Sequence, residues 1–289
     1  MIPEEPYHAT AEGILVPEWP VVHRDQEYDP TGFGVLRDMQ IRHFWYRGRH
    51  RFVRYALARA LGPATVGANA ALRAIDLGGG CGGWIRYLKE RDPDRFAELA
   101  VGDSSRHALE FAAPVVGPGV ARYQIDLYDL GWRERWDLAF LLDVLEHIPD
   151  DRRVLHQIRE SLCPGGTLIV TTPALQSLWT YNDDLAKHVR RYSRRDLAVL
   201  ARESGLELVW SRYFMFLLSP LLLASRLGSP DLARMSPAEI AEHARRTHST
   251  PPWPVNRLLG LIFAAETPLG AWLPFPWGTS VLAVMRRPR

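Results

Sequence analysis

Apolar residues of this chain recur in short runs that are separated by helical patterns. Runs at 71–77, 98–102, 120–125, 136–143 and 167–172 have the length of buried strands, and amphipathic segments follow the first, second and fourth of them. Strands separated by helices favour parallel pairing with right-handed crossovers, which brings the carboxyl ends of the strands to one edge. The pattern predicts a doubly wound α/β fold with its ligand site at that edge.

Two more strand candidates, at 206–213 and 279–285, bring the predicted sheet to seven strands, most of them parallel. Helical spacing from Gly34 to Leu61 predicts one or two helices before the sheet, and Pro164-Gly165-Gly166 predicts a turn that closes the helix at 150–162. The chain divides into four predicted parts. These are an N-terminal arm and helices (1–61), a ligand-binding core (62–213), a helical insertion (214–277) and the last core strand (278–289).

A glycine-rich loop, Gly78-Gly79-Gly80-Cys81-Gly82-Gly83, lies between the first core strand and its helix. Glycines at 78, 80 and 82 allow a tight turn and a close approach of the backbone to a ligand. Such a loop could hold a dinucleotide pyrophosphate. Asp76, however, ends the strand just before the glycines, where it would repel a pyrophosphate but attract a cationic amine. Asp103 ends the next strand, where a carboxylate can bind both hydroxyls of a ribose.

Further motifs follow the glycine loop in a fixed order. They are Asp126 with Leu127, Asp143-x-x-Glu146-His147 and Pro164-Gly165-Gly166. Together with Asp76-x-Gly-x-Gly-x-Gly82 and Asp103, this set resembles the class I S-adenosylmethionine-dependent methyltransferase family over residues 40 to 213. The segment His43-Phe44-Trp45-Tyr46-Arg47-Gly48-Arg49 is similar to one found upstream of the glycine loop in part of that family. Its alternative is a helix that only packs its aromatic side chains.

The resemblance implies S-adenosylmethionine as the cofactor. It places the glycine loop under the methionine part, Asp103 on the ribose, Asp126 on the adenine amino group and Arg47 on the cofactor carboxylate. The cofactor-binding residues implied in this way are Tyr46, Arg47, Asp76, Gly78, Gly80, Gly82, Asp103, Ser104, Asp126, Leu127, Leu142 and Asp143.

Methyl transfer needs a nucleophile held in line behind an activated methyl carbon, with water excluded. If the acceptor is a hydroxyl or an ammonium group, histidine is a natural proton acceptor near neutral pH. His147, just past the fourth strand, is the first candidate base, and a histidine that caps or positions a loop is its alternative. His188, in the segment after the fifth strand, is the second. We expect no metal, because no clustered set of ligands can be recognised from the sequence.

The segment 214–277 contains dense apolar runs at 214–218 and 258–263, with tryptophans and prolines around them. Its helices could pack on each other or on a second copy of the chain, could form a lipophilic substrate tunnel, or could contact a membrane surface. We expect this segment to decide which substrate is accepted. We do not expect it to be needed for building the cofactor pocket. Its most apolar stretch, 213–227, is broken by Pro220 and is too short for a transmembrane helix.

Charge and composition limit the classes of partner that we expect for this chain. The net charge of +2 implies no particular partner. Arginines cluster at 47–51 and 190–195, but these clusters form no continuous basic face, so we expect no nucleic-acid partner. We interpret each cluster as a solvated helix face. The two cysteines form no disulfide framework, and the N-terminus has no secretory pattern, so a cytoplasmic location is expected. The preference for arginine over lysine suggests a GC-rich genome, for which we expect a role in specialised metabolism.

The sequence therefore predicts an enzyme that methylates an oxygen or nitrogen of a small, rather apolar metabolite. Whether two copies of the chain form a homodimer stays open. Two alternatives stay open. One is a non-catalytic or regulatory protein of the same fold that binds the cofactor. The other is an NAD-dependent oxidoreductase, which would need a tyrosine–lysine pair that the only two lysines, Lys89 and Lys187, do not supply.

Overall fold

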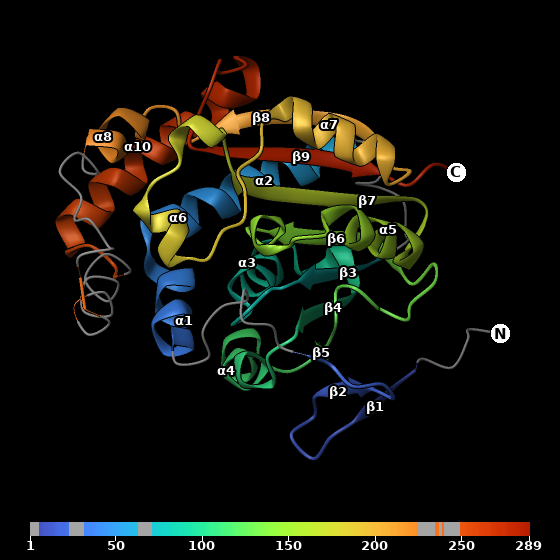
Figure 1. Ribbon diagram of the computed structural model, residues 1–289. Coiled ribbons are helices and arrows are strands. Elements are labelled where there is room, and N and C mark those ends of the chain that lie inside the picture. The colour runs from blue at the N-terminus through green and yellow to red at the C-terminus, as the bar shows by residue number, and fades with distance from the viewer. Residues whose placement is uncertain (1–5, 23–31, 63–70, 225–234, 237–238, 240–248) are drawn as a thin grey trace.

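The structure of the protein, a computed structural model, describes residues 6–22, 32–62, 71–224, 235–236, 239 and 249–289. These residues form one sheet with helices on both faces (Figure 1). The predicted doubly wound α/β fold is confirmed.

The described strands pair in the order β1-β2-β5-β4-β3-β6-β7-β9-β8. Their bounds are β1 (Tyr7–Ala9), β2 (Leu15–Pro17), β3 (Leu72–Leu77), β4 (Phe96–Asp103), β5 (Val120–Gln124), β6 (Trp136–Leu142), β7 (Leu162–Pro173), β8 (Glu207–Phe214) and β9 (Ser280–Arg286). Strands β3 to β7 are parallel to one another, whereas β9 is antiparallel to β7 and β8. Parallel pairing brings the carboxyl ends of β3, β4 and β6 to one edge of the sheet.

Helices cover both faces of the sheet. Their bounds are α1 (Phe33–Arg42), α2 (Phe44–Leu61), α3 (Gly83–Arg91), α4 (Arg106–Val116), α5 (Asp151–Ser161), α6 (Tyr181–Leu185), α7 (Arg194–Glu203), α8 (Ser219–Ala224) and α10 (Trp253–Trp272). Side chains of β6 alternate between the faces: Ala139 and Leu141 pack with α5 and α7, whereas Leu138 and Phe140 pack with α2 and α3. Because both faces are covered, residues 138–142 of β6 are a continuous apolar run in the sequence.

The N-terminal arm differs from its prediction. Strands β1 and β2 form a hairpin, and β2 pairs in parallel with β5, which makes the sheet nine-stranded instead of seven-stranded. Tyr7 stacks on Trp132 at 4.9 Å between ring centroids and donates a hydrogen bond from its hydroxyl to the Leu130 carbonyl at 3.0 Å. Strands of three residues have too few positions to show periodicity, so these aromatic contacts were not visible in the sequence.

The junction between α5 and β7 is a second correction. Strand β7 begins at Leu162 and includes the predicted turn at 164–166. The register with β6 shifts there, because Trp136 pairs with Leu162 and Leu138 with Thr167. The extra residues form an irregular stretch of strand instead of a separate turn.

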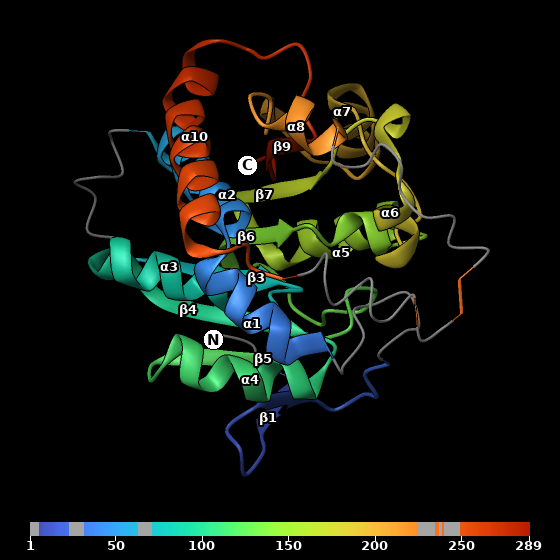
Figure 2. The same ribbon diagram turned by 90° about the vertical axis from the view of Figure 1, so that its left-hand side faces the viewer.

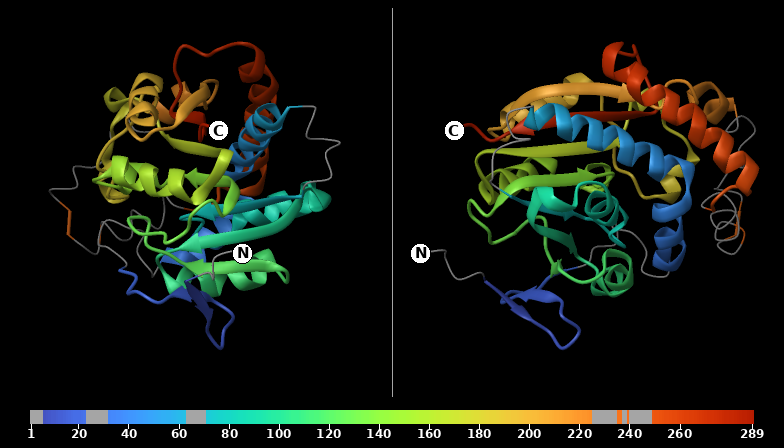
Figure 3. Two further views of the ribbon diagram at one scale, coloured as in Figure 1. Left: turned by 90° about the vertical axis from the view of Figure 1, so that its right-hand side faces the viewer. Right: turned by 180° about the vertical axis from the view of Figure 1, so that it is seen from behind.

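Two described helices, α8 and α10, lie in the segment 214–277, whose residues 225–234, 237–238 and 240–248 are outside the described residues. Helix α10 packs along α2 (Figures 2 and 3). A Cβ atom added to Gly48 of α2 would lie 1.9 Å from the ring of Phe263 in α10. Asn256 of α10 also accepts a hydrogen bond from the Phe44 backbone at 2.8 Å. The insertion thus packs against α2. The division predicted from the sequence placed these two segments in separate parts and included no contact between them.

Candidate active site

A cavity of about 930 Å³ opens at the carboxyl edge of the parallel strands. Side chains from α1, α2, α6 and α8 and from the ends of β3, β4, β6 and β7 line it. Figure 1 shows α1 and α6 at this end of the sheet, with α8 and α10 beside them. Cavities of this size hold cofactors and small molecules. The edge that the sequence predicts for a ligand is therefore the edge at which the cavity lies.

The glycine loop forms part of the cavity wall. Gly78 has φ 72° and Gly80 has φ 56°, both in the left-handed region, and both residues line the cavity. A Cβ atom on Gly78 would lie 2.6 Å from Val144, whereas one on Gly82 would lie 2.4 Å from Val116 of α4. Gly82 therefore lies outside the cavity, and its small size serves the packing of α3 on α4.

Asp103, at the end of β4, ties the glycine loop to the cavity wall. Its carboxylate accepts hydrogen bonds from the backbone N–H groups of Gly80 and Ser105, each at 2.9 Å. Asp103 lines the cavity, as does Ser104 beside it. Because two backbone donors fix this carboxylate, its position is set before any ligand arrives.

Two predicted acids lie behind the wall instead of in it. Asp76 is buried at the end of β3, and its Oδ1 atom has no hydrogen-bond partner among the described residues. Burial raises the pKa of Asp76 to about 7, against the opposing effect of Arg49. Asp126 accepts a hydrogen bond from the Tyr128 backbone at 2.9 Å and so shapes the turn after β5. Its neighbour Leu127 lines the cavity, but Asp126 does not.

Arg49 lies in the cavity wall, as does Arg191. Arg49 is 4% exposed, forms an ion pair with Asp143 and donates to the Leu142 carbonyl at 3.3 Å. Its guanidinium lies 5.2 Å from the ring of Trp45 and 5.1 Å from the ring of Tyr46. Residues three and four apart share a helix face, which groups these three side chains.

Arg47, which the resemblance assigned to the cofactor carboxylate, is exposed and does not line the cavity. Helical geometry turns it away from the face shared by Tyr46 and Arg49. The predicted cofactor residues that do line the cavity are Tyr46, Gly78, Gly80, Asp103, Ser104, Leu127, Leu142 and Asp143. Arg47, Asp76, Gly82 and Asp126 do not.

A second polar group joins Asp183 of α6 to His188 and Arg191 in the loop after that helix. Asp183 accepts a hydrogen bond from His188 Nδ1 at 2.8 Å and pairs with Arg191 through both oxygens, at 2.7 and 2.9 Å. Although burial opposes it, hydrogen bonding to His188 and Arg191 lowers the pKa of Asp183 below its ordinary value. Asp183 is therefore ionised, and it orients the His188 ring toward the cavity side of the loop.

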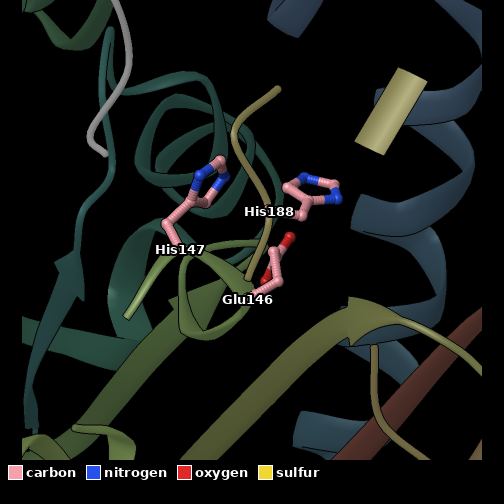
Figure 4. A group of neighbouring side chains, drawn as sticks. All are labelled: Glu146, His147 and His188. Atoms are coloured by element: carbon pink, nitrogen blue, oxygen red, sulfur yellow. The ribbon is translucent and has the colours of Figure 1, made fainter. Parts of the chain in front are cut away.

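His147 lies beside His188, with ring centroids 4.8 Å apart. Figure 4 shows the two rings next to each other, with the Glu146 carboxylate below His188. Burial, with a contribution from Asp143, raises the pKa of Glu146 well above its ordinary value. Both predicted histidines therefore meet in one place and line the cavity.

The arginine clusters are partly internal instead of fully solvated. Arg49 and Arg191 are buried in ion pairs, and Arg190 pairs with Asp151 at 2.8 Å. No sequence pattern predicted a separate role for Asp183 or Glu146. The spacing of Trp45, Tyr46 and Arg49 was a usable signal for Arg49, whereas nothing in the sequence links Asp183 to Arg191.

Known proteins resemble this chain in sequence. Residues 40–211 match the family described as methyltransferase domain. The chain is 36% identical over 110 residues to trans-aconitate 2-methyltransferase of Methylobacterium nodulans, a match that covers 38% of this chain and 42% of that protein. It is 33% identical over 112 residues to the ubiquinone biosynthesis O-methyltransferase of Alkalilimnicola ehrlichii, covering 37% of this chain and 44% of that protein. The match thus spans less than half the length of these relatives.

Solved structures share the fold. A phosphoethanolamine N-methyltransferase 2 of Haemonchus contortus, solved with S-adenosyl-L-methionine, has a TM-score of 0.58 at 17% identity and covers 95% of this chain and 62% of that chain. A chain from the complex between the Haloferax volcanii Trm112 methyltransferase activator and a methyltransferase has a TM-score of 0.57 at 18% identity. The match covers 93% of this chain and 100% of that chain. No helix among the described residues has the length and apolarity needed to cross a bilayer. From the family match and the fold together, the chain belongs to the class I S-adenosylmethionine-dependent methyltransferases.

Proposed function

We propose that the protein transfers a methyl group from S-adenosylmethionine to an oxygen or nitrogen atom of a small, rather apolar metabolite. One observation supports this proposal most directly. Gly78 and Gly80 of the glycine loop line the same cavity as Asp103, His147 and His188. A cofactor site and an acceptor site that share one cavity meet the geometric need of direct group transfer.

The glycine-loop end fits the cofactor. Gly78 and Gly80 line the cavity with backbone alone, and the Asp103 carboxylate is a charged acceptor for ribose hydroxyls. Leu127 offers an apolar surface for the adenine ring, and Asp143 lies at the end of β6 where the resemblance places the methyl donor. When bound, S-adenosylmethionine supplies an activated methyl carbon on a sulfonium centre.

Many of the cavity walls are apolar. Apolar side chains that line the cavity include Phe44, Trp45, Ile148, Leu221, Leu222 and Leu259. Aromatic and aliphatic walls of this kind bind apolar parts of a small molecule and exclude water. The Alkalilimnicola relative is named as an O-methyltransferase. We therefore place oxygen ahead of nitrogen as the acceptor atom.

The histidines supply the proton chemistry. Because Asp183 accepts from His188 Nδ1, the lone pair of His188 is assigned to Nε2, where it can accept the proton of an acceptor hydroxyl. His147 is the second group within reach of that position. The acceptor oxygen then bonds to the methyl carbon as the carbon–sulfur bond breaks, and S-adenosylhomocysteine is the co-product.

Turnover tests this proposal. The full chain is incubated with methyl-labelled S-adenosylmethionine and a panel of small hydroxyl, carboxyl and amine compounds, each with and without apolar groups. Transfer of label to an apolar hydroxyl or carboxyl compound supports the proposal, and transfer only to amines moves the acceptor to nitrogen. Cofactor binding without transfer to any acceptor, including a metabolite extract, would favour the non-catalytic alternative.

A further inference from the structure

Glu146, His147 and His188 form a compact cluster of metal-ligating side chains in the cavity wall (Figure 4). One potential ligand atom of each residue lies within 4.8 Å of those of the other two. Glu146 and His147 come from the short 3₁₀ helix after β6, and His188 comes from the loop after α6. The cluster therefore joins two segments that are forty residues apart in sequence.

One oxygen of the Glu146 carboxylate lacks a hydrogen-bond partner among the described residues. Glu146 is 1% exposed, and the oxygen in question is Oε2. A buried carboxyl oxygen without a partner costs free energy unless a proton or a cation satisfies it. Two imidazole rings lie next to this carboxylate, and neutral imidazoles are ligands for divalent transition metals.

The structure also supplies the outer contacts that such a site requires. Asp183 binds His188 Nδ1 at 2.8 Å, which fixes the ring and leaves Nε2 for a second partner. Carboxylate–histidine pairs of this kind orient the ligands of protein metal sites and increase their basicity. The Val189 N–H donates to the Glu146 carbonyl at 2.8 Å and ties the two segments together. The cluster is therefore held by contacts that need no ion.

We propose that Glu146, His147 and His188 bind one divalent transition-metal ion of the Zn²⁺ class. Two histidines and one carboxylate form the ligand set of catalytic zinc and non-haem iron sites, in which further coordination positions stay open. All three residues line the cavity, so the open positions face the space assigned to the acceptor. Mg²⁺ and Ca²⁺ fit less well because they prefer sites made entirely of oxygen ligands.

In the proposed reaction, the metal ion instead of a histidine base would promote loss of the proton from the acceptor hydroxyl. This role rests on the proposed function. A hydroxyl that coordinates the ion loses its proton more readily than a free hydroxyl, as water does on zinc. His188, as a ligand, would then not take the proton, which would leave to a solvent base as the oxygen attacks the methyl carbon. The proposal replaces the expectation of a metal-free site.

Binding of Zn²⁺ tests the site without any need for activity. Tag-free full-length protein is treated with a chelator, dialysed and titrated with Zn²⁺ in competition with a chromogenic chelator, and Co²⁺ is used in parallel for its visible absorption. The variants are Glu146→Gln, His147→Asn and His188→Asn. His156→Ala is the matched control, because His156 is exposed on α5. Glu146→Gln keeps the size of the side chain, and far-UV circular dichroism checks each fold.

We expect one equivalent of Zn²⁺ per chain, at least tenfold weaker binding in each ligand variant, and unchanged binding in the control. A tenfold loss corresponds to about 1.4 kcal/mol. Absence of saturable Zn²⁺ and Co²⁺ binding, or binding that a folded Glu146→Gln variant leaves unchanged, overturns the site. A parallel titration with S-adenosylmethionine separates the two proposals, since cofactor binding without Zn²⁺ binding defeats only the metal site.

Discussion

Arg49 and Asp143 form an ion pair that joins helix α2 to the end of strand β6 in the wall of the cavity. Arg49 is the more deeply buried partner, with its side chain 4% exposed against 17% for Asp143. Asp143 adopts φ 58°, a left-handed conformation that is uncommon for a non-glycine residue. The pair therefore fixes an unusual backbone position at the point where the resemblance places the methyl donor.

Removing Arg49 should destabilise the protein strongly. Arg49→Met keeps most of the packing on Trp45 and Tyr46 but leaves the Asp143 carboxylate without its cation. Breaking a buried pair in this way costs about 3–5 kcal/mol of unfolding free energy. Arg47→Met, on the exposed side of the same helix, should change it by less than about 0.5 kcal/mol. Urea unfolding of both variants measures the two values. Equal effects would show that the pair carries no special stability.

Asp76 predicts a specific pH dependence. Its pKa is about 7 in the folded protein, against an ordinary value of 3.8. Between these values the folded state holds a proton that the unfolded state has released. The contribution of Asp76 to stability is therefore complete below the lower value and is lost as pH rises through the higher one.

Asp76→Asn should remove that part of the pH dependence. Urea unfolding at several pH values from about 4 to about 8 would show the wild-type free energy of unfolding falling relative to the variant, by about 1.4 kcal/mol per unit of pKa difference. Asp94→Asn is the matched control, because Asp94 is exposed. Identical slopes for Asp76→Asn and the wild type would contradict the raised pKa.

Gly48 tests the contact between the insertion and α2. A Cβ atom there would overlap the Phe263 ring, so Gly48→Ala should push α10 away from α2 and cost about 1–3 kcal/mol of unfolding free energy. Gly34→Ala is the control, because nothing lies within 4 Å of a Cβ added there. It should stabilise the protein slightly or leave it unchanged. Phe263→Ala should itself cost about 3–5 kcal/mol, because the ring is buried, but in that background Gly48→Ala should cost much less than in the wild type. A harmless Gly48→Ala variant would mean that the two helices do not pack as described.

The fold could be predicted because strand and helix patterns repeat with clear periods. The five crossover strands, the existence of the last strand and the glycine loop all follow from apolar runs and glycine positions, whereas the antiparallel direction of β9 was not predicted. The β1–β2 hairpin could not be predicted, because three-residue strands held by Tyr7 and Trp132 show no period. Its stability comes from contacts distant in sequence.

For the candidate site, some residues were predicted correctly and others were not. Residues at strand ends, such as Asp103 and Leu142, line the cavity because topology alone places them there. Arg47 shows where a motif is not enough, since only the helix face decides that Arg49 points into the cavity instead. The contact of Glu146 and His147 with His188 depends on how a loop returns to the sheet edge, which no local pattern encodes.

The central claim is that S-adenosylmethionine binds at the glycine loop with Asp103 on its ribose. Calorimetric titration of S-adenosylmethionine, S-adenosylhomocysteine and NAD into the wild type, Asp103→Ala and the exposed control Asp94→Ala tests it most directly. We expect saturable binding of the first two ligands and none of NAD. Asp103→Ala should lose about 1.5–3 kcal/mol of binding free energy, the scale of hydrogen bonds to a charged group, and Asp94→Ala should lose none. Saturable NAD binding without S-adenosylmethionine binding, or an Asp103→Ala variant of unchanged affinity, would contradict the account.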